Sequence, residues 1–548
     1  MAPDVRHPPA PASLRRTLRT VRVLVRAGVL SAGRPDRILR QLRALRTWGA
    51  TVAGGYAAAS ERVPDHVCVI DDNGPTTFRE MNLRARLLAV ELDRAGVRPG
   101  ARVGVLCRNH GAFVQTMAAC GRLGADSVLL NTGLAAAQVV AAAADHDLAA
   151  LVADAEFEDL YGGVAARVPR ITAWGEPSVP GPRVPWRARE IADTEEEPAP
   201  PESPGRLIVL TSGTTGTPKG ARRPTPKGPQ DAASVLSRIP LRSSDRILVA
   251  APVFHTWGLA GVQLGMSMRA TLVMRRQFDP EDVLRAVAEH RCTAVFAVPV
   301  MLRRIMDLPP RVRARYDTSS LRIVACSGSA MSPKLITEFM DEFGDVLYNL
   351  YGSTEVSWAT IATPEEMRRS PTTAGRPPLG TRVAVLDPDG VEVPPGTEGS
   401  VHVGNEMLFE GYTNGGTREV AHGLMATGDR GHVDGDGLLH VAGRDDDMII
   451  SGGENVFPRP VEELIVTLPP VREVVVTGVP DEEFGHRFAA FVVPYEGMRV
   501  DPNEIRLIVR RELGRFSVPR DVVLLDELPR NATGKVMKRL LPTDAPPR

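Results

Sequence analysis

Residues 211–220 read TSGTTGTPKG and carry the residue types of a phosphate-binding loop. The stretch combines three glycines, five hydroxyl side chains and the ammonium group of Lys219. Glycine permits positive φ, so consecutive backbone N–H groups can turn toward one anion while the side chains add donors. The common P-loop spacing fails because Pro218 stands where its second glycine belongs. A surface linker is the alternative, but the apolar run at 206–210 predicts a buried strand directly before the loop, which favours polyphosphate binding.

Three later stretches offer groups that suit the rest of a nucleotide. Residues 351–355 read YGSTE and supply a ring, hydroxyls and a carboxylate. Residues 427–429 read TGD, which we interpret as a tight turn that presents an acid to ribose hydroxyls, and Arg444 adds a guanidinium. Residues 530–535 read RNATGK and present Lys535 on a glycine-containing loop. Each stretch alone is also typical of an ordinary turn or a solvated charge, so the chemistry depends on their combination.

Together and in this order, the motifs resemble the adenylate-forming superfamily of acyl- and aryl-CoA synthetases, peptide-synthetase adenylation domains and luciferases. The resemblance covers about residues 55–540, includes PVFHTWG at 252–258 and SGGEN at 451–455, and is most similar to an actinobacterial-type fatty acyl-CoA synthetase. It implies a two-step reaction with ATP, Mg²⁺ and coenzyme A. A carboxylate attacks the α-phosphate to give an acyl-adenylate and pyrophosphate, and a thiol then displaces AMP. Because the attacking carboxylate is already an anion, the first step needs positioning and charge stabilisation rather than a general base.

The same resemblance implies roles for individual residues around ATP. Glu355 is implied to bind Mg²⁺, and Thr354 to contact the α-phosphate. Lys535 is implied to bridge the acid carboxylate and the α-phosphate as charge moves. The implied nucleotide-binding residues are Thr211, Ser212, Gly213, Thr214, Thr215, Gly216, Lys219, Gly328, Ser329, Ala330, Tyr351, Gly352, Thr354, Asp429 and Arg444.

Further residues are implied on the acid and thiol sides of the reaction. Asp446 matches the hinge about which the C-terminal domain rotates between the two steps. The implied acyl pocket comprises His255, Trp257 and Gly258, with the glycine leaving room for a long chain. A lone histidine is also common as a hydrogen-bonded core residue, so His255 keeps that second interpretation. The loop that reaches the coenzyme A side comprises Ser451, Gly452, Gly453 and Glu454.

The elements that must hold these loops follow from the hydrophobic pattern. Short apolar runs such as 102–106 and 127–130 alternate with helical segments, which predicts βαβ units and parallel sheets. Short β segments at 380–403 indicate a small barrel-like unit, and about the last hundred residues read as α+β. We therefore predict an α/β fold with a basic N-terminal extension (1–50), a large AMP- and acyl-binding domain (51–445) and a smaller mobile domain (446–548).

Composition bounds the class of protein. The 548 residues have a formal net charge of zero, and 5% are aromatic, which argues against a nucleic-acid partner. Five scattered cysteines without a CxxC pair indicate a reducing compartment, with neither a disulfide framework nor a zinc site. Since no apolar stretch is long enough to span a bilayer, we expect a cytoplasmic location, with peripheral membrane attachment as the alternative.

The first fifty residues differ from the rest because they hold eleven arginines and two acids. Apolar and basic residues alternate at helical spacing between Leu14 and Leu30. Through residues 14–47 this pattern suits a basic amphipathic helix on an anionic membrane surface. It also suits a transit peptide, or an arginine-rich helix packed on the protein's own surface.

The sequence favours an acid–thiol ligase that activates a small-molecule carboxylic acid, with a medium- or long-chain fatty acid as substrate and coenzyme A as acceptor. One alternative is a fatty acyl-AMP ligase that passes the acyl group to a carrier protein. Others are an aryl- or amino-acid-adenylating enzyme and a luciferase-like monooxygenase. A non-catalytic acyl-nucleotide binder is disfavoured, because Lys219, Glu355, Asp429, Arg444 and Lys535 are all present.

Overall fold

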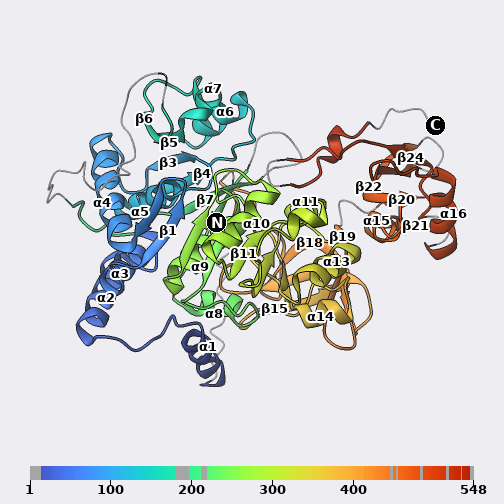
Figure 1. Ribbon diagram of the computed structural model, residues 1–548, viewed down its shortest axis with the longest axis horizontal. Coiled ribbons are helices and arrows are strands. Elements are labelled where there is room, and N and C mark those ends of the chain that lie inside the picture. The colour runs from blue at the N-terminus through green and yellow to red at the C-terminus, as the bar shows by residue number, and fades with distance from the viewer. Residues whose placement is uncertain are drawn as a thin grey trace.

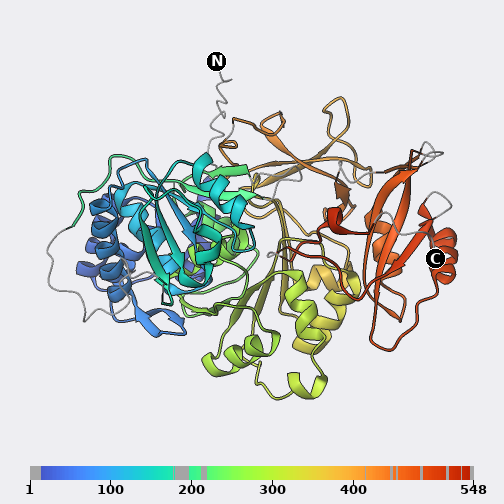
Figure 2. The same ribbon diagram turned by 90° about the horizontal axis from the view of Figure 1, so that it is seen from above.

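The computed structural model describes most of the chain, and Figures 1 and 2 show its arrangement from two sides. The described residues are 14–176, 178, 197–211, 219–226, 228–413, 415–444, 449–451, 454–481, 485–513, 517–531 and 534–542. The centre of the phosphate loop (212–218), the predicted hinge (within 445–448) and residues 452–453 lie outside that set.

Two mostly parallel sheets form the larger part of the molecule. The first has eight strands in the order β14 (Thr360–Ala362), β13 (Leu347–Tyr351), β12 (Ile323–Cys326), β11 (Ala294–Ala297), β9 (Arg246–Val249), β10 (Thr271–Met274), β1 (Val67–Asp71) and β2 (Gly74–Thr77). The second has six strands in the order β6 (Arg170–Trp174), β5 (Leu148–Asp154), β3 (Arg102–Leu106), β4 (Asp126–Leu129), β7 (Leu207–Thr211) and β8 (Lys219–Arg223). The edge strands β2, β14 and β8 pair antiparallel, whereas the inner strands pair in parallel, which confirms the βαβ prediction.

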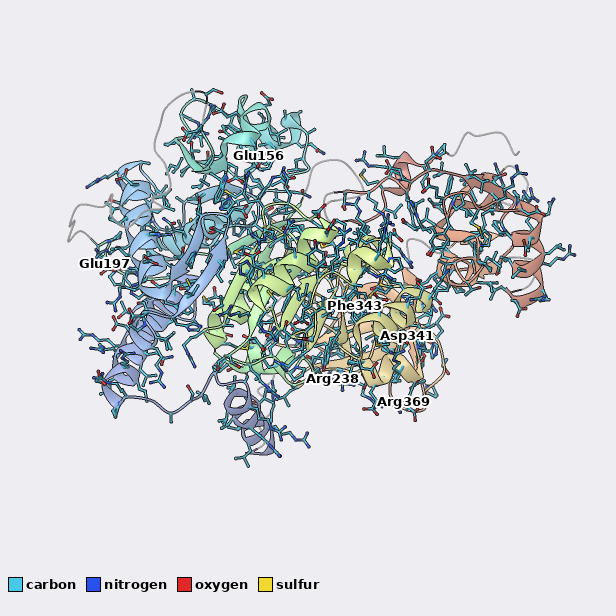
Figure 3. All side chains as sticks on the ribbon, viewed as in Figure 1. Glu156, Glu197, Arg238, Asp341, Phe343 and Arg369 are labelled. Carbon is cyan, nitrogen blue, oxygen red and sulfur yellow. The ribbon has the colours of Figure 1, made fainter. Side chains whose placement is uncertain are left out.

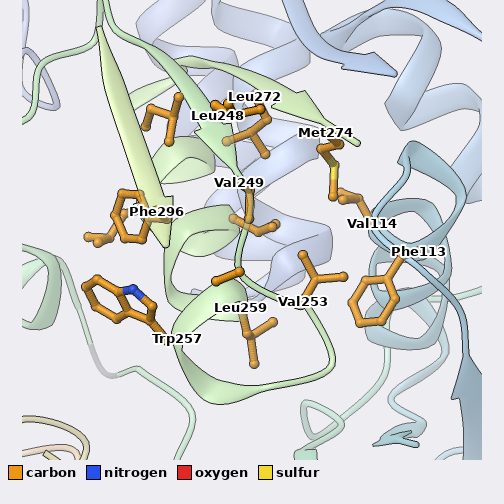
Figure 4. Close-up of a cluster of buried hydrophobic side chains, with 14 of the residues drawn as sticks. Phe113, Val114, Leu248, Val249, Val253, Trp257, Leu259, Leu272, Met274 and Phe296 are labelled. Atoms are coloured by element: carbon orange, nitrogen blue, oxygen red, sulfur yellow. The ribbon is translucent and has the colours of Figure 1, made fainter. Parts of the chain in front are cut away.

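Helices connect and cover these sheets. They are α3 (Val52–Arg62), α4 (Phe78–Arg94), α5 (Gly111–Leu123), α6 (Ala136–Asp145), α7 (Glu158–Tyr161), α8 (Gln230–Leu236), α9 (Thr256–Met268), α10 (Pro280–His290), α11 (Pro299–Met306), α12 (Pro310–Arg313), α13 (Pro333–Phe343) and α14 (Pro364–Arg369). Figure 4 shows how Phe113 and Val114 of α5 face Met274 of β10 and Val253 across the space between the two sheets. These side chains are fully buried, so one apolar core joins the two sheets.

A shared carboxylate also links the two sheets at their surface. Arg108, which follows β3, donates to Glu156 Oε2 at 2.6 Å, and Arg276, which follows β10, pairs with the same side chain. Glu156 lies on the short 3₁₀ turn Ala155–Phe157 after β5 and is labelled in Figure 3. The loops at the carboxyl ends of β3, β5 and β10 are therefore tied together.

Two smaller sheets complete the fold. An antiparallel unit comprises β15 (Arg382–Leu386), β16 (Gly399–Gly404), β17 (Val420–Ala421), β18 (Leu424–Val433) and β19 (Leu439–Arg444). The C-terminal unit comprises β20 (Ile449–Ser451), β21 (Glu454–Val456), β22 (Val471–Asp481), β23 (Gly485–Pro494), β24 (Asp521–Leu524), α15 (Pro458–Ile465), α16 (Pro502–Leu513) and the 3₁₀ turn Lys538–Leu540. In Figure 2 this unit, coloured red, stands beside the larger part. This agrees with the predicted α/β fold that has a smaller C-terminal unit.

The arginine-rich extension forms two helices, α1 (Leu14–Arg26) and α2 (Pro35–Trp48). Gly28 adopts φ +75° after α1, and Pro35 occupies the first turn of α2, so the chain breaks between them. Among the described residues, no helix is both long enough and apolar enough to cross a bilayer.

Candidate active site

A cavity of about 2050 Å³ lies at the junction of the sheets and the C-terminal unit. It brings together most of the described residues that the motifs singled out, although they come from distant parts of the sequence. Those that line it are His255, Trp257, Gly328, Ser329, Ala330, Tyr351, Gly352, Thr354, Glu355, Asp429, Arg444 and Lys535. The cavity exceeds the usual volume of a single ligand pocket, so it has room for a nucleotide and a second substrate.

Asp429 forms a fixed carboxylate on the cavity wall. Tyr351, at the end of β13, donates its hydroxyl to Asp429 Oδ2 at 2.5 Å, and the Asp429 N–H donates to Thr427 Oγ1 at 3.1 Å. Burial and the neighbouring carboxylate raise the pKa of Tyr351 well above its usual value, so its hydroxyl stays a donor. Arg444 of β19 is the ladder partner of Asp429. An acid held in this way can accept hydrogen bonds from the vicinal hydroxyls of a ribose.

The predicted tight turn at residues 427–429 is wrong. These residues lie inside the long strand β18, where Gly428 has φ +80° and the pairing with β16 is irregular. A glycine in the left-handed region lets the strand kink, and the kink aims the Asp429 side chain into the cavity.

Glu355 offers a charged oxygen ligand next to Thr354 on the cavity wall. Tyr412 donates its hydroxyl to Glu355 Oε1 at 2.6 Å, and Arg418 Nη2 lies 3.9 Å from the same oxygen. Burial by itself raises the pKa of Glu355, but the hydrogen bonds from Tyr412 and Ser353 outweigh it and leave the pKa below its usual value. The side chain is thus an ionised, largely buried carboxylate, which is the kind of ligand that Mg²⁺ takes in proteins.

Two side chains that the motifs did not identify hold Thr354. Its hydroxyl lies 3.3 Å from the Thr256 hydroxyl at the start of α9. Its carbonyl accepts a hydrogen bond of 2.8 Å from Arg223 at the end of β8. Burial lowers the pKa of Arg223 to about 10, while Glu355 acts in the opposite direction, so the guanidinium remains charged at neutral pH. It adds a positive charge to the part of the cavity wall that Thr354 and Glu355 also line.

Lys535 reaches the cavity on a tightly folded loop of the C-terminal unit. Its N–H donates to Asn531 Oδ1 at 2.9 Å, and the Gly534 N–H donates to the Asn531 carbonyl at 2.9 Å. Gly534 has φ +81°, and a Cβ there would stand 2.3 Å from Val300 of α11, so only glycine fits this approach. Burial, followed by the charge of Lys535, lowers the pKa of His255 to about 4, which makes His255 neutral at physiological pH.

The expected acyl-pocket residues separate into two kinds. Trp257 lines the cavity, and its indole N–H donates to the Ala297 carbonyl at 3.0 Å, which fixes the ring against the eight-stranded sheet. Gly258 is not among the described residues that line the cavity, which corrects its assignment as space for an acyl chain. A Cβ at position 258 would stand 2.3 Å from the Pro252 carbonyl oxygen. The glycine is therefore needed for backbone packing at the start of α9.

Several predicted residues have no described side chain. Ser212, Gly213, Thr214, Thr215, Gly216, Asp446, Gly452 and Gly453 lie outside the described residues. The structure describes only the backbone of Thr211, Lys219, Ser451 and Glu454. Thr211 and Lys219 face each other across the antiparallel β7–β8 pair, so the phosphate loop connects two neighbouring strands.

Tyr412, Arg418, Thr256 and Arg223 are the site residues that sequence reasoning missed. Thr256 could have been found, since it directly follows His255 within a stretch that was recognised. Tyr412 and Arg418 lie far along the chain from Glu355 in a segment without a motif. Their contact with Glu355 becomes visible only in three dimensions.

Comparisons with known proteins agree with this geometry. Residues 56–413 match the model of the AMP-binding enzyme family, and residues 460–535 match that of the AMP-binding enzyme C-terminal domain. A feruloyl-CoA synthase from Amycolatopsis sp. is 35% identical, covering 88% of this chain and 97% of that protein. The long-chain-fatty-acid–CoA ligase FadD13 from Mycobacterium tuberculosis is 32% identical, covering 85% and 92%. The solved structure of the amide bond synthetase McbA from Marinactinospora thermotolerans is 30% identical with a TM-score of 0.79, covering 89% and 98%.

The family model spans well over half of the chain, and its residues include the strands and loops that carry Tyr351, Thr354 and Glu355. Adenylate formation depends on positioning and on charge stabilisation, and the fixed carboxylates and the loop lysine of this cavity can supply both. The chain therefore belongs to the AMP-binding enzyme family, the adenylate-forming enzymes.

Proposed function

We propose that this protein is an acyl-CoA ligase that activates a large apolar carboxylic acid, specifically a medium- or long-chain fatty acid. Mg-ATP and the acid give an acyl-adenylate and pyrophosphate, and coenzyme A then displaces AMP to give the thioester. The observation that carries the substrate assignment is the shape of the cavity, which continues from its charged end along the whole of α9.

The charged end suits the first step. Asp429 would hold the ribose, Glu355 would be the protein's ligand to Mg²⁺, and Lys535 would stand between the acid carboxylate and the α-phosphate. Adenylation concentrates negative charge at phosphorus, so fixed cations that need no rearrangement lower its barrier. His255 is neutral at this point, so it can line the acid's path without pairing with the carboxylate.

The apolar end suits a long acid. Cavity-lining residues extend from His255, which precedes the first residue of α9, to Ser267 near its end, a length of about 18 Å at the usual rise of a helix. Across from them lie Ala58 and Ala59 of α3, and the wall also includes the buried side chain of Leu264. An aromatic acid with a short side chain would occupy only part of this length, whereas an extended acyl chain would fill it and bury more apolar surface.

The second step would use residues at the junction of the two units. We propose that Asp446 is the hinge about which the C-terminal unit rotates, and that the loop from Ser451 to Glu454 then faces coenzyme A. Rotation would withdraw Lys535, whose work ends once the adenylate has formed. This separates the two half-reactions between two arrangements of the same residues.

An aromatic acid is the second candidate substrate, since feruloyl-CoA synthase and the indoleacetate–CoA ligase of Aromatoleum aromaticum, 33% identical, are among the relatives. An alternative acceptor is an amine, because the amide bond synthetase McbA is a structural neighbour. A carrier-protein thiol is the third acceptor to be tested.

Pyrophosphate release from Mg-ATP tests these assignments across a series of saturated fatty acids, ferulate and indoleacetate, with and without coenzyme A. We expect continuous turnover with the longer fatty acids that requires coenzyme A. Preference for an aromatic acid would overturn the substrate assignment. A single burst that coenzyme A does not relieve, but an amine or a carrier protein does, would overturn the acceptor. A matched variant, Ala260→Phe, places a ring on the cavity wall of α9 and should reduce the rate with long acids more than with short ones.

A further inference from the structure

The helix α1 carries an apolar stripe on its outer face. Leu18, Val21 and Val25 are spaced by three and four residues, so they share one side of the helix, and they are 59%, 43% and 55% exposed. The helix is anchored beside this stripe, because Leu24 and, directly after the helix, Ala27 are buried against the body of the protein. The exposed stripe is thus the outer face of a docked helix rather than a frayed end.

Arginines flank this stripe and continue onto α2. Arg16 and Arg40 reach acids, since they pair with Glu406 and with Asp36 and Glu61 respectively. The exposed arginines that form no ion pair with another described residue are Arg19, Arg22, Arg26, Arg43 and Arg46. The surface is therefore both basic and apolar, an unusual combination for a face that only meets water.

The second helix joins this surface to the cavity. Leu39 of α2 is 67% exposed, and Leu42, one helical turn later, is 56% exposed and also lines the cavity. Ile38 and Leu45 of the same helix line the cavity as well. Figure 1 shows α2 at the lower left of the molecule beside α3, and α1 at the bottom below α8. The end of the cavity along α9 therefore opens beside the exposed side of α2.

We propose that α1 and α2 dock on an anionic lipid bilayer, with the stripe of α1 and Leu39 entering the interface and the arginines meeting lipid phosphates. A bilayer supplies the two chemistries that this surface presents, an apolar phase and a layer of negative charge. A nucleic acid would match the arginines but would leave the exposed apolar side chains without an apolar partner. Binding of an acidic protein would not explain why the cavity opens beside α2. The extension lies outside the matched family domain, so the surface belongs to this chain rather than to the shared catalytic fold.

Docking would also give the acid a route from the lipid into the cavity beside Leu42. This second part rests on the proposed function, because it assumes that the substrate partitions into membranes. Binding to a bilayer does not depend on the reaction. An experiment can therefore refute the proposed fatty-acid substrate without refuting bilayer binding, and the reverse.

Sedimentation of the full chain with vesicles tests the docking. Vesicles of phosphatidylcholine alone are compared with vesicles that also contain phosphatidylglycerol, at low and high salt. We expect binding to the anionic vesicles that weakens with salt, because screening reduces the attraction of exposed charges. Each arginine near the surface contributes roughly fivefold to partition. Replacing Arg19, Arg22, Arg26 and Arg43 by glutamine should therefore lower binding by about a hundredfold or more.

A second variant separates a bilayer from other occupants. Leu18→Gln with Val21→Gln and Val25→Gln removes the apolar stripe and keeps every arginine, so it should also lose vesicle binding. Leu507→Gln with Arg510→Gln is the matched control on the exposed face of α16, and it should bind like the wild type. The melting temperature and pyrophosphate release with a short soluble acid check that each variant is folded.

Three outcomes would overturn the proposal. The first is equal sedimentation of the wild type with neutral and anionic vesicles, or none with either. The second is full binding by the stripe variant, which would indicate a charge-only partner such as a nucleic acid. The third is a dimer in light scattering that the same variants abolish, which would make the surface an interface between copies of this chain.

Discussion

Replacing Lys535 by alanine should slow adenylation and leave thioester formation from supplied acyl-adenylate nearly unchanged. The loop that carries Lys535 is held without the Lys535 side chain, by backbone N–H groups that donate to the side chain and the carbonyl of Asn531 and by the close approach of Gly534 to Val300. Truncating an exposed side chain on such a loop removes a charge without loosening its support. The effect should therefore report on chemistry rather than on folding.

The rate loss has an expected size, and the pKa of His255 gives a second, independent readout. Loss of one preorganised group that stabilises the transition state costs about 10²–10³-fold in kcat, or about 2.7–4 kcal/mol. The charge of Lys535 is also the second cause, after burial, of the low His255 pKa of about 4. Without it the His255 pKa should rise, yet stay below the ordinary value of 6.5, because burial still disfavours the charged imidazolium.

The assays are pyrophosphate release for adenylation, thioester formation from synthetic acyl-adenylate, and NMR titration of His255. Lys535→Arg keeps a positive charge on the same loop, so His255 should keep its low pKa in that variant even if adenylation is slowed. An equal loss in both half-reactions would refute the role of Lys535 in the first step. An unchanged His255 pKa in Lys535→Ala would refute the placement of the lysine beside the histidine.

Other substitutions give distinct results. Asp429→Asn should raise the KM for ATP by tenfold or more, at about 1.5–3 kcal/mol for a hydrogen bond to a charged group, and leave the KM for the acid unchanged in steady-state kinetics. Tyr412→Phe removes a hydrogen bond that lowers the Glu355 pKa, so the acid limb of the pH–rate profile should move to higher pH; an unmoved limb would separate Glu355 from catalysis. Gly258→Ala should lower the melting temperature without changing chain-length preference, because its Cβ meets a backbone carbonyl, and a changed preference would restore Gly258 to the acid pocket. Asp446→Pro should spare adenylation and impair thioester formation, and survival of both steps would contradict the hinge.

The sequence predicted the buried strands well, because hydrophobicity alone marks them. The apolar runs at 102–106 and 206–210 became β3 and β7, within one residue, because a strand buried on both faces reads as an unbroken apolar run. The basic extension was harder, since its alternation continues past the end of α1. Gly28 adopts φ +75° and ends the helix. The end of α1 is therefore set by the backbone conformation of a glycine, which the hydrophobic pattern does not indicate.

The site was predictable as far as its residues lie in contiguous motifs. Tyr351, Thr354 and Glu355 share one stretch, and their contacts to the cavity follow from the strand that ends at Tyr351. Tyr412, Arg418 and their effect on the Glu355 carboxylate were not predictable, because packing of the antiparallel unit against the eight-stranded sheet creates them. The assignment of Gly258 to the acyl pocket failed for a different reason. The glycine lies inside a recognised motif, but its role is a close backbone approach that a motif match does not reveal.

The proposed rotation of the C-terminal unit requires that the contacts holding that unit to the larger part be weak enough to break. Lys334 of α13 stands 5.1 Å from the ring centroid of Tyr495, and contacts of this type contribute only about 0.5–1 kcal/mol at exposed sites. Gly534 adds close packing on Val300 that brings Lys535 to the cavity. Contacts of this size favour one orientation without locking it, as the proposed rotation requires. An orientation held more firmly would keep Lys535 in place after the adenylate has formed and obstruct the second step.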